Sequence, residues 1–437
     1  MNNPCRTQEY LFFSVSVTLF GFDFKQDEVN PRLQCLQPYP FEKMASLLEG
    51  IVPPADKAAI ALSIGEPCHA APKLAFEAMT ASLSRLAHYP ATRGDITLRE
   101  TIANWLNQRF GLTDQPIDPQ SQVLPVNGTR EALFAIAQCV IDPSNNAKVL
   151  TANPFYQIYE GAALLAGAKP VYLNPAPGKL IPDFECISDA LWQDCQLLYI
   201  CSPNNPTGSC IDLATLQKLI EKAQRFNFVI ASDECYSEIY FDEDCPPPGL
   251  LQAAQAIGLK NFRNCLVFHS LSKRSNLPGL RSGFVAGDGE IMKAFFQYRT
   301  YHGCAMPPVT QATSIAAWQD EEHVKANRQL YREKFSAVLN ILKPVMSVSL
   351  PDAGFYLWPE LALEANMDDK LFAQRLYREE NIKVVPGSYL SREVNGCNPG
   401  HNRIRMALVA KQQECTEAAK RIRNFIVKLQ QEGLWKN

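Results

Sequence analysis

The middle of the chain alternates short apolar runs with stretches of helical spacing. Strand-like runs lie at residues 148–151, 169–173, 197–200, 228–231 and 265–268, and helical spacing is found at 156–166 and 212–226. An unbroken apolar run such as residues 197–201 is typical of a strand that is buried on both faces of a parallel sheet. The alternation therefore predicts an α/β fold with helices on both sides of a parallel sheet.

Size and charge narrow the kind of protein. A length of 437 residues exceeds one ordinary domain, and 46% hydrophobic with 20% charged residues is typical of a globular chain, so we expect two domains. The net charge of −3 favours a small-molecule partner over nucleic acid or membrane. Fourteen cysteines without a C-x-x-C pair argue against zinc and for reduced thiols, so we expect no metal site and a cytoplasmic location.

The first 28 residues differ from the rest. Their apolar run at residues 11–22 is too short to span a bilayer, and it lacks the basic start and small-residue cleavage site of a secretory signal. We therefore expect residues 1–28 to be a non-native or disordered extension. The native protein would begin at Val29, because a valine codon can also start translation.

Polar loops follow several of the predicted strands. They lie at residues 153–156, 202–208, 232–236 and 270–281, and ligands bind at the carboxyl ends of strands in parallel sheets. A fifth loop, Asn127-Gly128-Thr129, leads from an apolar run into a predicted helix, whose first N–H groups suit a phosphate, although such a turn can also be an ordinary cap. We expect these loops to form one site.

Lys273 is the candidate reactive residue. A lysine after a buried strand can lose its proton because desolvation lowers its pKa, and the free amine can form a Schiff base with an aldehyde. Ser270, Ser272 and Arg281 could hold a phosphate, the arginine in bidentate fashion. This chemistry belongs to pyridoxal phosphate (PLP); the alternative for the loop alone is a solvated surface segment.

Asp233 follows a strand whose end should be buried. A buried carboxylate needs a cationic partner, and the protonated pyridine nitrogen of PLP is one; the alternative is a helix N-cap. Asn205 and Tyr236 can both donate to the phenolate oxygen of the same ring. Tyr156 could stack on the ring face or simply be a core residue.

Together these motifs resemble the fold-type I PLP-dependent aminotransferases of class I/II. The resemblance covers about residues 30–430 and implies a large domain with a seven-stranded, mostly parallel sheet and a smaller α+β domain. It divides the chain into an arm and part of the small domain at 29–70, a PLP-binding domain at 71–305 and a small domain at 306–437. It rests on motifs in the family's order: Tyr89, Asn127-Gly128-Thr129, Asn153-Pro154-x-Tyr156, Asn205-Pro206-Thr207-Gly208, Asp233-x-x-Tyr236, Ser270-x-Ser272-Lys273, Arg281 and Arg403-Ile404-Arg405.

The resemblance also assigns roles. Lys273, Asp233 and Tyr236 are the implied catalytic residues: the lysine carries the cofactor and moves the proton, and the aspartate binds the pyridine nitrogen. The implied phosphate ligands are Gly128, Thr129, Ser270, Ser272 and Arg281, and Tyr89 would reach the phosphate of the other subunit in a homodimer with shared sites.

The substrate's α-carboxylate is assigned to Arg403, with a backbone contact from Gly65 and a further contact from Asn205. Arg405 is expected on the opposite face of the same strand, in a surface or interdomain salt bridge.

Residues 30–33 with 37–43, residues 153–161 and residues 298–308 are similar to the succinyldiaminopimelate aminotransferases of bacterial lysine biosynthesis. These exchange an amino group between glutamate and N-succinyl-2-amino-6-oxoheptanedioate. Both substrates carry a second carboxylate, for which Arg299 and Arg93 are candidates, with a surface role as the alternative for each.

Two kinds of rival function remain. Within enzymes, the same residues would serve alanine, kynurenine or aromatic amino acids, or a β-elimination. Outside enzymes, aminotransferase-like modules bind effectors in transcription regulators, but residues 1–28 are too short and not basic enough to be the DNA-binding domain that such a protein needs.

Overall fold

The computed structural model of the chain describes residues 29–436, so the extension predicted at residues 1–28 lies outside the described residues. The described residues fall into two units, residues 29–36 and residues 37–436. In the described part of the first unit, residues 31–35 form a short 3-10 helix. All sheets lie in the second unit.

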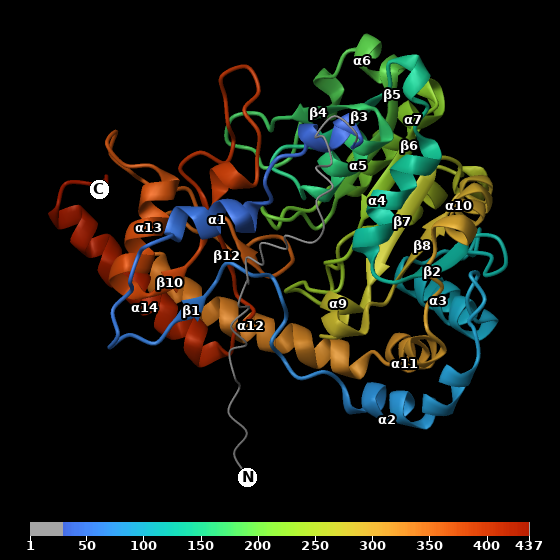
Figure 1. The fold of residues 1–437 in the computed structure, drawn as a ribbon, viewed down its shortest axis with the longest axis horizontal. Helices are drawn as coiled ribbons and strands as arrows, with labels where there is room; N and C mark the ends of the chain where they lie inside the picture. Colours follow the sequence, from blue (N-terminus) through green and yellow to red (C-terminus); the bar gives the residue numbers. More distant parts are fainter. Residues whose placement is uncertain (1–28, 437) are drawn as a thin grey trace, which may run out of the picture. The chain divides into compact units, whose positions relative to one another are not determined.

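A seven-stranded sheet is the centre of the second unit (Figure 1). Its strand order is β2-β8-β7-β6-β5-β3-β4, and only β8 runs antiparallel to its neighbours. This confirms the predicted mostly parallel sheet. The strands are β2 (Val123–Val126), β3 (Lys148–Ala152), β4 (Lys169–Leu173), β5 (Cys195–Cys201), β6 (Val229–Asp233), β7 (Cys265–Ser270) and β8 (Gly283–Gly287).

Helices cover both faces of this sheet (Figure 1). Side chains alternate along a strand, and β5 sends Leu198 and Ile200 into one hydrophobic core and Leu197 and Tyr199 into the other. Burial on both faces explains the unbroken apolar run at residues 197–201. The first core takes side chains from α3 (Ile96–Arg109), α7 (Leu213–Phe226), α8 (Leu250–Ala256) and α11 (Pro308–Gln319), and the second from α4 (Thr129–Val140), α5 (Ile158–Ala166) and α10 (Gly289–His302).

A third core belongs to the smaller α+β part, and α12 and α14 pack along each other within it. Here β1 pairs with β10, and β9 and β11 flank β12 in an antiparallel sheet. The predicted domain boundaries stay predictions; α11 follows residue 305, yet Trp318 belongs to the core of the large sheet. The elements are α1 (Pro40–Leu48), β1 (Ile60–Ala61), α12 (Glu322–Leu342), β9 (Tyr356–Leu357), α13 (Asp369–Glu380), β10 (Ile382–Lys383), β11 (Val385–Pro386), β12 (Ile404–Ala407) and α14 (Gln412–Gln431).

The topology collects the polar loops at one edge of the large sheet. Strands β2, β3, β5, β6 and β7 all end at this edge, because each runs in the same direction. The antiparallel strand β8 begins there, with Gly283 paired to Ser270 at the end of β7. Within residues 29–436, no helix combines the length and the apolarity that a bilayer crossing requires.

Candidate active site

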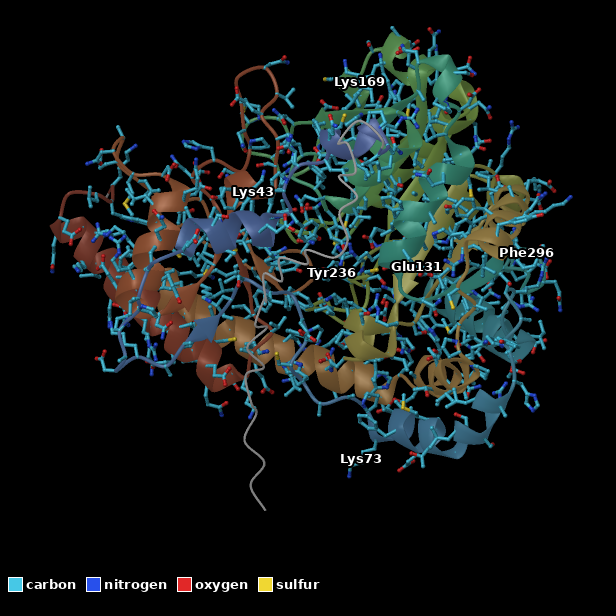
Figure 2. The ribbon with its side chains drawn as sticks, viewed as in Figure 1. Lys43, Lys73, Glu131, Lys169, Tyr236 and Phe296 are labelled. Carbon is cyan, nitrogen blue, oxygen red and sulfur yellow. The ribbon has the colours of Figure 1, made fainter. Side chains whose placement is uncertain are left out.

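A cavity of about 850 Å³ opens at this edge of the sheet. Tyr236 and Glu131, which Figure 2 labels in the central part of the molecule, both line it. The predicted site residues that line the cavity are Gly65, Thr129, Tyr156, Asn205, Asp233, Tyr236, Ser270, Ser272, Lys273 and Arg281. The structure therefore brings together residues from every predicted loop.

Lys273 lies in α9 (Leu271–Arg274), a single turn that directly follows β7. Its Nζ donates to the carbonyl oxygen of Gly65 at 2.5 Å. Burial lowers the pKa of Lys273 to about 8. The amine therefore faces the cavity with a much smaller free-energy cost of deprotonation than an exposed lysine has.

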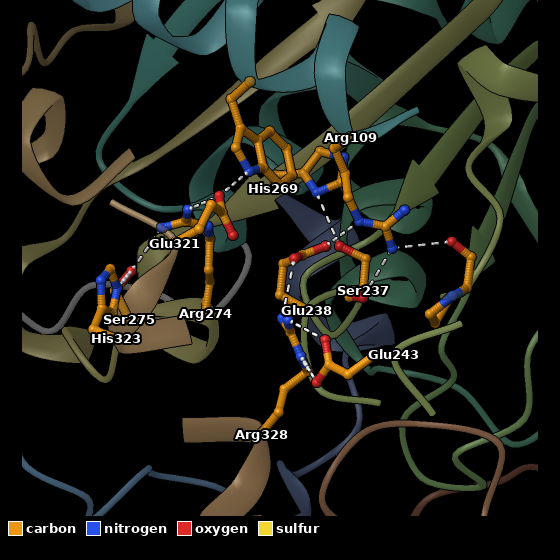
Figure 3. Close-up of polar contacts among 12 residues, drawn as sticks. Arg109, Ser237, Glu238, Glu243, His269, Arg274, Ser275, Glu321, His323 and Arg328 are labelled. Atoms are coloured by element: carbon orange, nitrogen blue, oxygen red, sulfur yellow. Dashed lines mark hydrogen bonds and ion pairs between the residues drawn. The ribbon is translucent and has the colours of Figure 1, made fainter. Parts of the chain in front are cut away.

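The chain immediately after Lys273 is anchored in the protein interior (Figure 3). The buried guanidinium of Arg274 donates to the carbonyl oxygen of Ala317 at 2.7 Å and pairs with Glu321 at 2.5 Å. Ser275 Oγ lies 2.8 Å from Nε2 of His323. These contacts tie the lysine loop to the junction between α11 and α12, which fixes where the amine points.

Several groups that suit a phosphate lie at the same cavity as the Lys273 amine. Gly128 is the N-cap of α4, with φ of 89°, and a side chain there would collide with the guanidinium of Arg281. The first N–H groups of α4, the hydroxyls of Ser270 and Ser272 and the Arg281 guanidinium are all donors. A helix N-terminus beside hydroxyls and an arginine is suited to a phosphate dianion.

We expect Gly128→Ala to weaken PLP binding about 10- to 100-fold, because a positive φ at a residue with Cβ costs about 1–3 kcal/mol and the new methyl group displaces Arg281. The measurement is titration of the apoprotein with PLP. Gly279→Ala is the matched control, since a Cβ there meets no atom within 4 Å and its φ is not positive. Equal affinities in the two variants would contradict the assignment.

Asp233 also lines the cavity and is 5% exposed. Its Oδ2 accepts a hydrogen bond from the Tyr159 hydroxyl at 2.8 Å, and its Oδ1 accepts one from the backbone N–H of Cys235 at 3.2 Å. Burial raises the pKa of Asp233, and these hydrogen bonds oppose that rise. Among residues 29–436, no basic side chain forms an ion pair with it.

A buried carboxylate without a cation in the protein fits a ligand that brings the cation itself, and the pyridinium of PLP does so. The phosphate donors therefore match the phosphate of PLP, the Lys273 amine matches its aldehyde, and the Asp233 carboxylate matches its pyridine nitrogen. Sequence reasoning missed Tyr159, because a tyrosine in an apolar helix looks like a core residue. Its position three residues after Tyr156, one helical turn away, was the available signal.

Two tyrosines and an arginine form another part of the cavity wall. The hydroxyls of Tyr236 and Tyr356 lie 3.0 Å apart, and burial raises the pKa of Tyr236 well above its usual value, so its hydroxyl keeps a proton. Arg405 donates to Asn205 Oδ1 at 2.9 Å and to the carbonyl oxygen of Ser63 at 2.7 Å. Arg405 is therefore held in the cavity by two fixed acceptors.

This placement corrects the expectation for Arg403. Its guanidinium pairs with Glu360 at 2.6 Å and donates to the Trp358 carbonyl oxygen at 3.3 Å, and it does not line the cavity. The expectation that Arg405 points to the opposite face was wrong, because residues two apart in a strand share a face. Position along the strand separates the two arginines: Arg403 precedes β12, whereas Arg405 lies within it, opposite Val385.

The candidates for a distal carboxylate also lie elsewhere. Arg299 is buried and pairs with Glu131 at 2.8 Å, so the surface role given as its alternative is wrong as well. Arg93 donates to the Gln120 carbonyl oxygen at 2.6 Å and lies over the Phe296 ring, which Figure 2 labels. Neither arginine lines the cavity.

Tyr89 is fully exposed and does not line the cavity. Its contact with the phosphate of a second subunit stays a prediction.

Comparison with known proteins agrees with this geometry. The family model described as aminotransferase class I and II matches residues 57–422. An LL-diaminopimelate aminotransferase of Nitratidesulfovibrio vulgaris is 30% identical over 368 residues, which are 83% of this chain and 90% of the relative. An aminotransferase structure from Neisseria meningitidis has a TM-score of 0.85 at 46% identity, covering 92% of this chain and all of the other.

A probable N-succinyldiaminopimelate aminotransferase from Thermus thermophilus is 25% identical with a TM-score of 0.75, covering 84% of this chain and 95% of its own. The family match extends over most of the chain, and the cavity holds hydrogen-bond donors that suit a phosphate and a carboxylate that suits a protonated pyridine nitrogen. The chain therefore belongs to the class I and II aminotransferases and is a PLP-dependent enzyme.

Proposed function

We propose that the enzyme transfers an amino group between glutamate and N-succinyl-2-amino-6-oxoheptanedioate, a reaction of lysine biosynthesis through diaminopimelate. The observation that carries this proposal is Arg130, a cation on the cavity wall that sequence reasoning did not single out. Arg130 is exposed, lies over the Tyr39 ring at 5.5 Å and has no carboxylate partner among residues 29–436. Arg130 thus offers a free charge to an acidic group beyond the reacting centre.

The walls around Arg130 suit a long substrate. Tyr39, Phe134 and Ile158 line the same cavity and give it an apolar surface beside the cation. Glutamate and the succinylated keto acid both carry a carboxylate beyond the α-carbon. We infer that Arg130 binds this second carboxylate in each substrate alternately, so that a single site accepts donor and acceptor in turn.

LL-diaminopimelate is the second candidate substrate, because two of the relatives are named LL-diaminopimelate aminotransferases. Its distal end holds an ammonium beside a carboxylate, so its net attraction to Arg130 is weaker than that of the succinylated compound. An ammonium would need a carboxylate of the protein. Glu131 is already paired with Arg299, which leaves Glu66 as the acidic group on the wall for this role.

The proposed roles at the reacting centre follow from the contacts of each residue. Arg405 binds the α-carboxylate through its planar guanidinium, replacing Arg403 in that role. The Lys273 amine, near the carbonyl oxygen of Gly65, removes and returns the α-proton. Asn205 Oδ1 accepts from Arg405, so its Nδ2 remains as a donor toward the cofactor's phenolic oxygen.

When bound, PLP supplies an electron sink that stabilises the negative charge left at the α-carbon. Asp233 holds a proton on the pyridine nitrogen, and its own burial strengthens that interaction because the local dielectric constant is low. Tyr236 keeps its hydroxyl proton and donates it toward the phenolic oxygen. Tyr156 lines the cavity from the loop after β3 and would cover one face of the ring.

A substrate panel tests the proposal. With 2-oxoglutarate as acceptor, we expect kcat/KM for N-succinyl-LL-2,6-diaminopimelate to exceed the values for LL-diaminopimelate, alanine, kynurenine and phenylalanine by at least about 10-fold. A preference for unmodified LL-diaminopimelate would establish the second candidate. A preference for alanine or an aromatic amino acid, or release of pyruvate by β-elimination, would overturn both.

The Arg130 assignment has its own control. Arg130→Ala should lower kcat/KM for glutamate and for the succinylated substrate about 10-fold and leave alanine unchanged, because alanine has no second carboxylate. Arg93→Ala removes an arginine that lies outside the cavity and should change none of the three. Equal losses for alanine would show that Arg130 acts on the fold.

A homodimer with Tyr89 in the partner's site and a cytoplasmic location remain part of the proposal.

A further inference from the structure

Cys235 connects the two ends of the cofactor cavity. Its backbone N–H donates to Oδ1 of Asp233 at 3.2 Å, at the pyridine end. Its Sγ lies 3.0 Å from Oγ1 of Thr129, at the phosphate end. Both Cys235 and Thr129 line the cavity. Cys235 is thus in contact with both Asp233, the residue proposed for the pyridine nitrogen, and Thr129, the residue proposed for the phosphate.

The direction of the hydrogen bond between thiol and hydroxyl decides what Thr129 can do. A threonine hydroxyl has one proton, and donating it to sulfur would point it away from a phosphate. Burial raises the pKa of Cys235 well above its usual value, so the thiol keeps its own proton and can donate. Sulfur is a weak acceptor, whereas a phosphate oxygen is a strong one, so with PLP bound the favoured arrangement has the thiol as donor.

Thr129 has little freedom to reorient by itself. It is 8% exposed and occupies the first position of α4. Its methyl group packs against the start of β8, where a Cβ on Gly283 would come within 3.2 Å of Thr129 Cγ2. The thiol has a second acceptor in the carbonyl oxygen of Phe268 at 4.0 Å, but the Thr129 hydroxyl is nearer at 3.0 Å. When the thiol donates to Thr129 Oγ1, the hydroxyl proton is free to point into the cavity.

We propose that Cys235 is a positioning residue for the phosphate of PLP: its thiol donates to Thr129 Oγ1 and thereby directs the Thr129 hydroxyl proton to the phosphate. The cysteine does not touch the substrate in this account. Its effect is independent of which amino acid the enzyme uses, and its thiol acts on the phosphate through Thr129.

Comparing PLP with pyridoxal, which lacks the phosphate, isolates this role. Apoprotein variants Cys235→Ala and Cys235→Ser are titrated with each compound. Cys235→Ala should weaken PLP binding about 5- to 10-fold more than it weakens pyridoxal binding, because only PLP has the phosphate that the Thr129 hydroxyl contacts. Cys235→Ser should recover most of the PLP affinity, because a serine hydroxyl can also donate to Thr129. Cys210→Ala, at a cysteine outside the cavity, should change neither affinity.

A double-mutant cycle tests whether the effect passes through Thr129. Thr129→Val keeps the branched shape and removes the hydroxyl, so Cys235→Ala should cause no further loss of PLP affinity in that background. Equal losses for PLP and pyridoxal would overturn the proposal in favour of a general effect on cavity shape. An additive loss in the Thr129→Val background, no loss in Cys235→Ala, or no recovery in a folded Cys235→Ser would overturn it as well. Melting temperatures of the apoproteins identify any variant that fails to fold. If Cys235→Ala does not fold, the comparison of PLP with pyridoxal is made with Cys235→Ser, the most conservative change. Its PLP affinity is expected to be close to that of the native chain.

Discussion

Lys273→Ala is expected to lower kcat by at least about 10⁴-fold, because it removes both the amine that carries PLP and the base that moves the α-proton. The phosphate donors and Asp233 remain, so the variant should still bind PLP without a covalent link. The measurement combines steady-state turnover with titration of the apoprotein by PLP.

Lys273→Arg distinguishes the chemical role of the amine from the role of its positive charge. The guanidinium keeps a positive charge but does not lose its proton at accessible pH, so it can neither carry PLP nor act as a base. We expect it to be as inactive as Lys273→Ala. Substantial turnover in Lys273→Arg would mean that position 273 supplies only a cation, and the account of the site would be wrong.

Arg405→Ala is expected to lower kcat/KM about 10²- to 10³-fold for every amino-acid substrate, since two charge-assisted hydrogen bonds to the α-carboxylate are lost together. The effect should be uniform, because glutamate, alanine and the succinylated compound share this group. Arg405→Lys keeps the charge but not the planar fork and should recover only part of the loss. The assay is kcat/KM across these three substrates.

Arg403→Ala is the matched comparison two residues away in the sequence. Arg403 pairs with Glu360 near the surface, and exposed ion pairs contribute about 0–1 kcal/mol, so we expect kcat/KM within about 3-fold of the native value. A large, uniform loss in Arg403→Ala together with a small one in Arg405→Ala would reverse the assignment. Melting temperatures of both variants show whether the buried acceptors of Arg405 destabilise the fold when left without a donor.

Much of the fold and of the cavity could be predicted from the sequence because parallel sheets have few solutions. Once strands are placed at residues 197–200, 228–231 and 265–268, their carboxyl ends must meet at one edge. The loops that carry Asn205, Asp233 and Lys273 then converge, as the structure has them. The order of the strands is set by crossover connections, whose path is not encoded in the local pattern.

The missed residues depend on geometry that a linear pattern does not carry. Arg403 and Arg405 are only two residues apart, and the start of β12 at Ile404 leaves Arg403 before the strand and Arg405 within it. Arg299 and Arg130 both lie on helices beside the site, but Glu131 neutralises Arg299 and leaves Arg130 without an ion pair among the described residues. Which arginine pairs with Glu131 depends on the tertiary structure and cannot be read from the linear sequence.

The central claim, that PLP is held on Lys273 in this cavity, is tested most directly by borohydride reduction of the purified holoprotein followed by peptide mapping with mass spectrometry. Lys334 is an internal competitor: burial lowers its pKa to about 8 as well, but its Nζ donates to the carbonyl oxygen of Leu408 and it does not line the cavity. We expect the pyridoxyl label on the peptide that contains Lys273 and on no other. A label on Lys334 or on any other lysine, or none at all in a PLP-saturated protein, would contradict the account.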